Sequence, residues 1–194
     1  MHVAELAHET DFDGWRRAAR ALRSQGVAPD HARFVVAGAG QGGLFDTGPS
    51  IADEASFASS PAAEVPFAVP KAFVDLAKEV ILHRTIDRFD LMYRLLWRLR
   101  DEPDLIKVVS DVDVADAFER AKNVSRSSHK MKAFVRFRQV QDDVGEAWVA
   151  WFEPAHRVLE KTAPFFMRRF TTMRWSILTP DGSAFWDGEA LTMG

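Results

Sequence analysis

The chain has no cysteine among its 194 residues, which excludes disulfide bonds, thiol nucleophiles and thiolate ligands for zinc or iron–sulfur clusters. It also lacks any apolar run near the ~20 residues that a membrane helix needs. Acidic residues near the start, in MHVAELAHETDFDGW, stand where a secretory signal has its apolar block. We therefore expect a cytoplasmic protein with no membrane partner.

Apolar residues are plentiful, at 47% of the chain with 15 Phe and 6 Trp, which is enough for a substantial core. Apolar positions at helical spacing predict helices over residues 12–24, within 70–109, over 112–131, and from Pro154 to about 170. Alternating patterns predict strands, two of them near the start and four in two hairpins near the end, at residues 3–6, 33–37, 134–140, 146–153, 174–179 and 184–187. This order indicates a single α+β domain over residues 1–194. We expect a mostly antiparallel sheet from the N- and C-terminal strands, packed with a central helical segment.

One segment differs from the rest in composition. Residues 38–66 are rich in Gly, Ser, Ala and Pro and show little periodicity, which predicts a flexible insertion. Gly38, Gly40 and Gly43 match the spacing of a dinucleotide-binding loop, but that site needs a helix to begin there. Gly48 and Pro49 follow too closely for such a helix, so we read the match as coincidental.

The strongest chemical signal is a basic segment. Residues 120–138 hold seven basic residues and no acidic one, namely Arg120, Lys122, Arg126, Lys130, Lys132, Arg136 and Arg138. Lys122, Arg126 and Lys130 follow one another at four-residue spacing on the predicted helix, with His129 beside them. Arg136 and Arg138 share one face of the predicted strand. Lysine and arginine bind phosphate backbones, although such a segment is also typical of a solvated helix face.

Aromatic and basic residues later in the chain extend this pattern. Trp148, Trp151 and Trp175 lie on neighbouring predicted strands, where exposed rings can stack unpaired bases and buried ones fill a core. Arg168 and Arg169 end the last predicted helix, where cations favour the helix dipole and can also clamp a phosphate. The candidate nucleic-acid-binding set is Lys122, Arg126, His129, Lys130, Arg136, Arg138, Arg168, Arg169 and Trp175.

Candidate catalytic residues are fewer. Glu153 and His156 stand three residues apart at a predicted helix start, where they can act as an acid–base pair or share a metal. Glu153 is equally a helix-start anion, and no second pair or histidine cluster completes a metal site. His129 is the third candidate, and we expect neither a metal nor another cofactor.

Five blocks of the sequence resemble a bacterial family assigned to DNA metabolism and DNA repair, whose domain has no known function. They are TDFDGWRRAARAL at 10–22, FDLMYRLLWRLRDEPDL at 89–105, HKMKAFVRFR at 129–138, WFEPAHRVLEKTAPFFMRRF at 151–170, and RWSILTPDGSAFWDGEAL at 174–191. In that family the gene neighbours a radical-SAM protein, or the domain is fused to a uracil-DNA-glycosylase-like domain. The resemblance implies DNA and one of these proteins as partners, and it brings no catalytic residues.

We therefore expect a DNA-repair accessory protein that binds DNA through the basic helix and strand and works with such a partner. Two alternatives remain open from the sequence. One is an enzyme acting on DNA or nucleotides through His129, Glu153 and His156. The other is a protein–protein adaptor that docks a partner through its amphipathic helices at 71–100.

Overall fold

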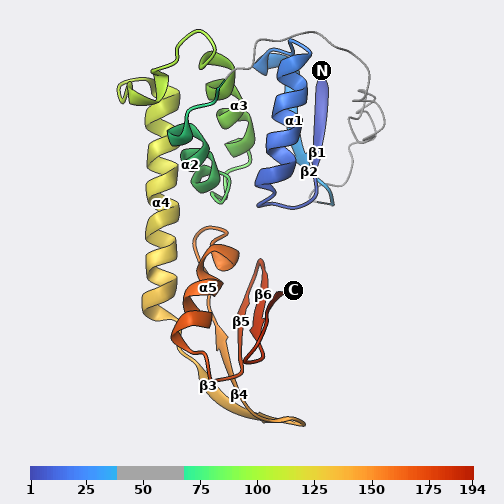
Figure 1. The fold of residues 1–194 in the computed structure, drawn as a ribbon, viewed down its shortest axis with the longest axis vertical. Helices are drawn as coiled ribbons and strands as arrows, with labels where there is room; N and C mark the ends of the chain where they lie inside the picture. The colour runs from blue at the N-terminus through green and yellow to red at the C-terminus, as the bar shows by residue number, and fades with distance from the viewer. Residues whose placement is uncertain (39–67) are drawn as a thin grey trace. The chain divides into compact units, whose positions relative to one another are not determined.

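The computed structural model describes residues 1–38 and 68–194 (Figure 1). The predicted insertion at 38–66 therefore lies, apart from Gly38, outside the described residues, as does the rest of the glycine motif. The described chain divides into two compact units. Unit 1 comprises residues 1–81 and 85–121, and unit 2 comprises residues 82–84 and 122–194. The single domain of residues 1–194 stays a prediction.

Unit 1 is mainly helical. Its elements are β1 (His2–Leu6), α1 (Phe12–Ser24), the 3-10 turn η1 (Pro29–His31), β2 (Ala32–Val36), α2 (Lys71–Val80), α3 (Arg88–Arg98), the 3-10 turn η3 (Leu105–Lys107) and the first part of α4 (Val112–Phe134). The helix predicted over residues 12–24 is confirmed. Asp11 caps it by accepting a 2.7 Å hydrogen bond from the Gly14 N–H. Trp15, Ala19 and Leu22 are buried at helical spacing.

The core of unit 1 forms around aromatic rings from α1, β2, α2 and α3. Trp15 packs against Phe34 and Phe73, and Phe34 packs edge-on against Tyr93. The Tyr93 hydroxyl donates a 2.7 Å hydrogen bond to the Val27 carbonyl. The apolar sides of α2 and α3 are thus buried in the core of unit 1. Little apolar surface at residues 71–100 is left exposed for the docking of a partner, which the adaptor alternative requires.

Unit 2 contains the rest of α4 and a five-stranded sheet. Its other elements are β3 (Arg138–Asp142), β4 (Gly145–Trp151), α5 (Leu159–Arg169), β5 (Trp175–Thr179), β6 (Gly182–Trp186) and β7 (Leu191–Met193). The strands pair in sequence order, and every pair is antiparallel except β4 with β5, which α5 connects. The expected α+β class and mostly antiparallel sheet are confirmed. The N-terminal strands β1 and β2 pair with each other in parallel and form a separate sheet.

Two boundaries differ from the prediction. α4 continues to Phe134, and the next strand begins only at Arg138, so Arg136 lies between helix and strand. The Val135 N–H still donates to the Met131 carbonyl, and the Arg136 guanidinium donates to the carbonyls of Ala133 and Val135 at 2.8 and 3.0 Å. Arg136 thereby satisfies carbonyls at the helix end, which stabilises the longer helix.

The second difference concerns the residues after Pro154. The predicted helix begins at Leu159 instead, and Glu153 and His156 lie in irregular structure. The backbone N–H of His156 donates to the Ser127 hydroxyl at 3.2 Å, and that of Arg157 donates to the Leu82 carbonyl at 3.0 Å. These tertiary hydrogen bonds hold the segment in a bent, non-helical path up to Leu159.

Candidate nucleic-acid interface

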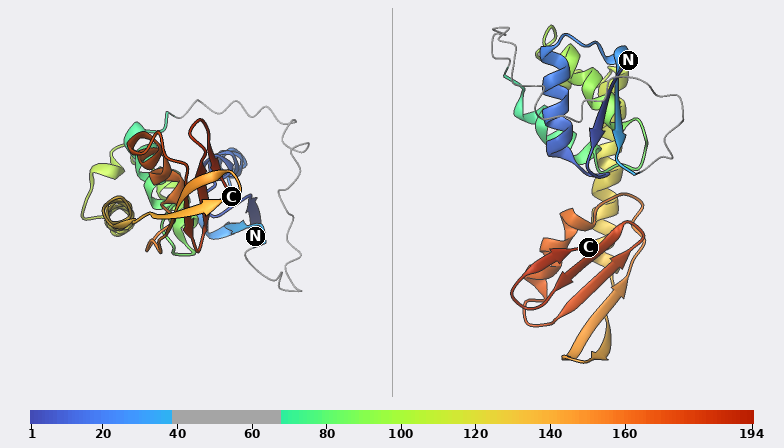
Figure 2. Two further views of the ribbon diagram at one scale, coloured as in Figure 1. Left: turned by 90° about the horizontal axis from the view of Figure 1, so that it is seen from below. Right: turned by 90° about the vertical axis from the view of Figure 1, so that its right-hand side faces the viewer.

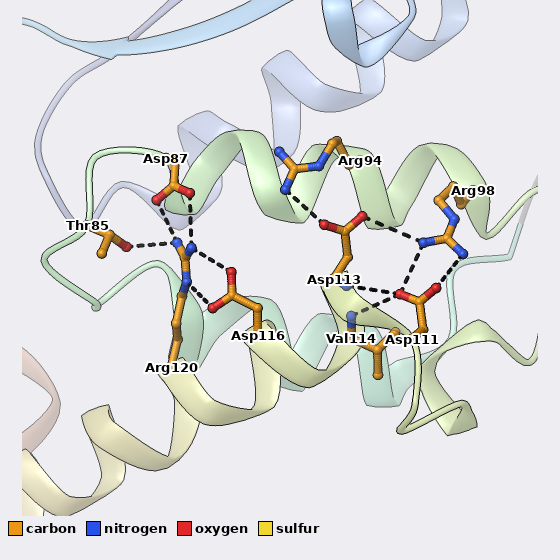
Figure 3. Close-up of polar contacts among 9 residues, drawn as sticks. All are labelled: Thr85, Asp87, Arg94, Arg98, Asp111, Asp113, Val114, Asp116 and Arg120. Atoms are coloured by element: carbon orange, nitrogen blue, oxygen red, sulfur yellow. Dashed lines mark hydrogen bonds and ion pairs between the residues drawn. The ribbon is translucent and has the colours of Figure 1, made fainter.

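The first cation of the basic segment belongs to the packing of unit 1. Arg120 is 8% exposed, and its guanidinium bonds to both carboxylate oxygens of Asp87 at 2.7 and 3.0 Å, to Asp116 and to the Thr85 hydroxyl (Figure 3). The hydrogen bond from Arg120 lowers the pKa of Asp87. Arg120 is therefore not available to a ligand, and the basic segment that faces solvent begins after it.

The neighbouring arginines of α3 are paired in the same way. Arg94 donates to Asp113 at 2.9 Å, and Arg98 bonds to both oxygens of Asp111 at 3.1 and 2.7 Å (Figure 3). The Asp111 carboxylate also accepts from the N–H groups of Asp113 and Val114, at the start of α4. The hydrogen bond from Arg98 lowers the pKa of Asp111. These ion pairs join α3 to α4 within unit 1.

The cations that follow in unit 2 contrast with this arrangement. Among the residues that the structure describes, no carboxylate forms a salt bridge with the exposed side chains of Arg126, Lys130, Lys132, Arg136 or Arg138. Unit 2 holds twelve lysines and arginines against eight aspartates and glutamates, a formal net charge of +4. Unit 1 holds thirteen against twenty, a net charge of −7. Positive potential is thus concentrated on unit 2.

The second half of α4 separates its charged and apolar sides clearly. Val124, Ser127, Ser128 and Met131 are buried, whereas Lys122, Arg126, His129 and Lys130 are exposed. Lys132 is also exposed, and its ammonium lies 5.5 Å from the centroid of the Phe165 ring. We call the exposed residues Arg126, His129, Lys130, Lys132, Arg136 and Arg138 the basic surface. Lys122 lies one helical turn before Arg126 on the same side.

The end of α5 lies next to the last part of this surface. Arg168 and Arg169 are exposed in the final turn. The Arg169 guanidinium carbon is 5.5 Å from the centroid of the Phe170 ring, and that ring packs edge-on against Phe137 at 5.4 Å. Phe137 stands between Arg136 and Arg138 in the chain. Lys132 of α4 and Arg169 of α5 thus both lie against rings of one aromatic cluster, which consists of Phe137, Phe165, Phe166 and Phe170.

Trp175 does not belong to the interface, contrary to the expectation. It is 2% exposed and packs against Phe137 and Phe166, and its indole N–H has no hydrogen-bond partner among the described residues. β5 has a neighbouring strand on both sides, and Trp175 lies on the face that α5 covers. Of the three tryptophans considered, Trp151 is the exposed one, at 59%. Successive residues of a strand face opposite sides of the sheet, so the exposed tryptophan cannot be identified before the strand bounds are known.

The three candidate catalytic residues do not form a common site. The His156 backbone contacts Ser127 on the buried side of α4. His129 follows Ser127 by two residues, or about 200° around the helix, and faces solvent. Glu153 accepts a 3.0 Å hydrogen bond from the Trp151 indole N–H. His129 therefore groups with the basic surface, and Glu153 with Trp151.

His156 is instead part of a structural cluster in unit 2. Its ring stacks on His83 at 4.1 Å between centroids, and its Nδ1 accepts from the Arg84 backbone N–H at 3.4 Å. Burial and the neighbouring charges of His83, Arg84 and Arg157 lower the pKa of His156 to about 4. The ring is neutral at pH 7, with the proton on Nε2. It is therefore a poor general acid–base group near neutral pH.

Arg84 and Asp181 complete this cluster, and neither residue was predicted from a sequence pattern. The Arg84 guanidinium binds both oxygens of Asp181 at 2.9 and 2.5 Å and donates to the carbonyls of Pro154 and Ala155 at 3.3 and 3.1 Å. This clamp joins the chain before Thr85, the segment after β4 and the β5–β6 turn. Its contacts with Asp181 and with the two carbonyls hold these loops together.

Within residues 1–38 and 68–194, no three histidine, aspartate or glutamate side chains gather as metal ligands would. No helix in that part of the chain has the length and apolar character that crossing a bilayer requires.

Comparison with known families gives one match. Residues 86–187 match the sequence profile of DUF4130, which is described as a domain of unknown function. No curated protein and no solved structure matches the chain.

Proposed function

The chain belongs to the DUF4130 family, and we propose that it is a DNA-binding accessory protein of DNA metabolism or repair. In this proposal the basic surface and the adjoining Arg168 and Arg169 hold the DNA backbone. A partner supplies the chemistry, and the resemblance of the sequence blocks to the DNA-repair family favours a uracil-DNA-glycosylase-like or radical-SAM protein in that role.

The absence of carboxylate partners around the basic surface carries this proposal. Arg94, Arg98 and Arg120 bind carboxylates of unit 1, so a phosphate would have to displace an existing ion pair. Arg126, Lys130 and Arg138 have no such competitor among the described residues. A phosphodiester chain that neutralises them also releases its own counterions, which makes binding favourable at moderate salt.

The salt dependence of binding tests the proposal directly. Binding of a fluorescein-labelled duplex of about 20 base pairs is measured by anisotropy between about 50 and 200 mM salt. Each lost phosphate contact lowers the slope of log K against log salt by about 0.9. The double variant Arg126→Glu with Lys130→Glu should therefore bind more weakly and lose about 1.8 from the slope.

The chain offers a matched control on another helix. Arg16 and Arg20 are also exposed, also four residues apart, and also without a carboxylate partner among the described residues, but they lie on the negatively charged unit 1. Arg16→Glu with Arg20→Glu changes the total charge by the same amount. We expect this control to bind DNA within about twofold of the unaltered protein. Equal effects of the two double variants would refute a localised interface.

A further inference from the structure

The five-stranded sheet of unit 2 has one covered and one open face. Alternate residues of β4, β5 and β6, among them Ala150, Trp175, Ile177 and Ala184, are buried on one side and share a core with Ala163 and Phe166 of α5. In the right-hand view of Figure 2, α5 lies behind the strands, and the opposite face of the sheet is turned toward the viewer. The residues between the buried ones therefore point away from the core.

The strand register shows which side chains share this open face. Arg138 pairs with Val149, Val149 with Ser176, and Ser176 with Phe185. Directly paired residues lie on the same face, so these four form one row across β3, β4, β5 and β6. Trp151 stands two residues beyond Val149 on the same face and pairs with Leu178. The backbone positions of Trp151 and Phe185 are about 12 Å apart, because they are two strands apart across the sheet and two residues apart along the strand direction.

Both aromatic residues present their rings to solvent. Trp151 is 59% exposed and Phe185 is 41% exposed. Glu153 accepts the indole N–H of Trp151 at 3.0 Å, and a hydrogen bond to that N–H lies at the edge of the ring, in its plane. Glu153 therefore fixes the orientation of the indole without covering its faces.

The open face carries one cation in the row of paired residues, Arg138, and the Glu153 carboxylate lies at the edge of the Trp151 ring. No carboxylate of the described residues forms a salt bridge with Arg138. Asp142, which shares this face of β3, is neutralised by two contacts of 2.7 and 2.9 Å from Arg174. The hydrogen bond from Arg174 also lowers the pKa of Asp142. An acidic or neutral peptide gains less from this arrangement than a polyanion whose bases carry exposed π-faces.

We propose that the open sheet face binds unpaired bases, with Trp151 and Phe185 as stacking platforms and Arg138 on the adjoining phosphate. This inference rests on the proposed function and names the form of the ligand. The bases of an intact duplex are stacked on one another, so a flat protein surface cannot reach their faces. The ligand is therefore a single-stranded segment.

Two variants remove the rings while preserving strand propensity, Trp151→Thr and Phe185→Thr. The probes are a labelled oligothymidylate of about 15 nucleotides, an oligouridylate of the same length, and a blunt duplex of about 20 base pairs. We expect each variant to bind oligothymidylate roughly 5- to 100-fold more weakly and duplex unchanged. Trp151→Phe should restore much of the loss, because it restores a ring. Phe118→Ala is the matched control, since Phe118 is 43% exposed but lies in unit 1.

The possible results separate this inference from the proposed function. If Arg126→Glu with Lys130→Glu weakens binding but the threonine variants bind oligothymidylate normally, DNA binding stands and the stacking face is refuted. If no probe binds, both proposals fail. Tight binding of oligouridylate that is lost in the threonine variants supports the inference and extends the ligand to RNA. Preference for the duplex over both single strands would overturn it, and would leave the face to a protein partner.

Discussion

The neutral state of His156 makes a quantitative prediction about stability. The folded protein holds the pKa of this ring at about 4, against 6.5 for an exposed histidine, through burial and the charges of His83, Arg84 and Arg157. Above pH 6.5 the ring is neutral in both the folded and the unfolded chain. Between pH 6.5 and 4 the unfolded chain takes up a proton that the folded ring does not. The free energy of unfolding therefore falls as the pH is lowered through this window.

The size of the effect follows from the same pKa. The full difference corresponds to about 3 kcal/mol. Solvent reaches part of the ring, which screens the interaction, so we expect a contribution of about 1 to 2 kcal/mol. His156→Asn removes the titrating group but keeps an oxygen that can accept from the Arg84 N–H. Urea unfolding measures the fall in the free energy of unfolding between pH 7.5 and 4.5. This fall should be about 1 to 2 kcal/mol smaller for the variant than for the unaltered chain.

A direct measurement avoids the contribution of other titrating groups. The imidazole C–H resonances of the six histidines are followed by NMR against pH, and the signal missing in His156→Asn identifies His156. Its midpoint should lie near 4. A midpoint near 6.5 would refute the assignment of a neutral, buried ring and would return His156 to the list of acid–base candidates.

Four further predictions concern stability and charge. Arg120→Met should lower the free energy of unfolding by about 2 to 4 kcal/mol, because it leaves the carboxylates around a buried arginine unpaired; urea unfolding measures this. Tyr93 is the chain's one tyrosine, burial raises its pKa to about 12, and an ultraviolet titration should show that midpoint in the folded protein and one near 10 after unfolding. Tyr93→Phe should cost about 1 to 2 kcal/mol, because the Val27 carbonyl loses its partner. Arg126→Glu should raise the free energy of unfolding by about 0.5 kcal/mol while weakening DNA binding, and unchanged affinity would contradict the proposed interface.

Local patterns predicted the local structure well. Helix α1 was predictable at both ends because its apolar spacing and the Asp11 cap are encoded within a few neighbouring residues. The segment after Pro154 was not, because hydrogen bonds from His156 to Ser127 and from Arg157 to Leu82 decide its path. Such partners lie far away in the sequence and leave no periodic signal.

The sequence predicted the basic character of the candidate site, but not which residues belong to it. The acid-free segment is visible in the sequence, yet Arg120 and Arg126 look alike there. Only the fold shows that Asp87, 33 residues earlier, reaches Arg120. Likewise, Trp151 and Trp175 both occupy strands, and only the sheet register separates the exposed ring from the buried one. Burial and pairing are tertiary properties, so residue type alone could not assign them.

The two halves of α4 differ in their charge pattern. Arg120 in the first half of the helix is matched by Asp116 at four-residue spacing. The second half places Arg126 and Lys130 at the same spacing with like charges, which costs about 0.2 to 0.5 kcal/mol. A single Glu at position 126 would convert this repulsion into attraction. A polyanion relieves that repulsion when it binds, so the stability lost on this face would be recovered in the complex.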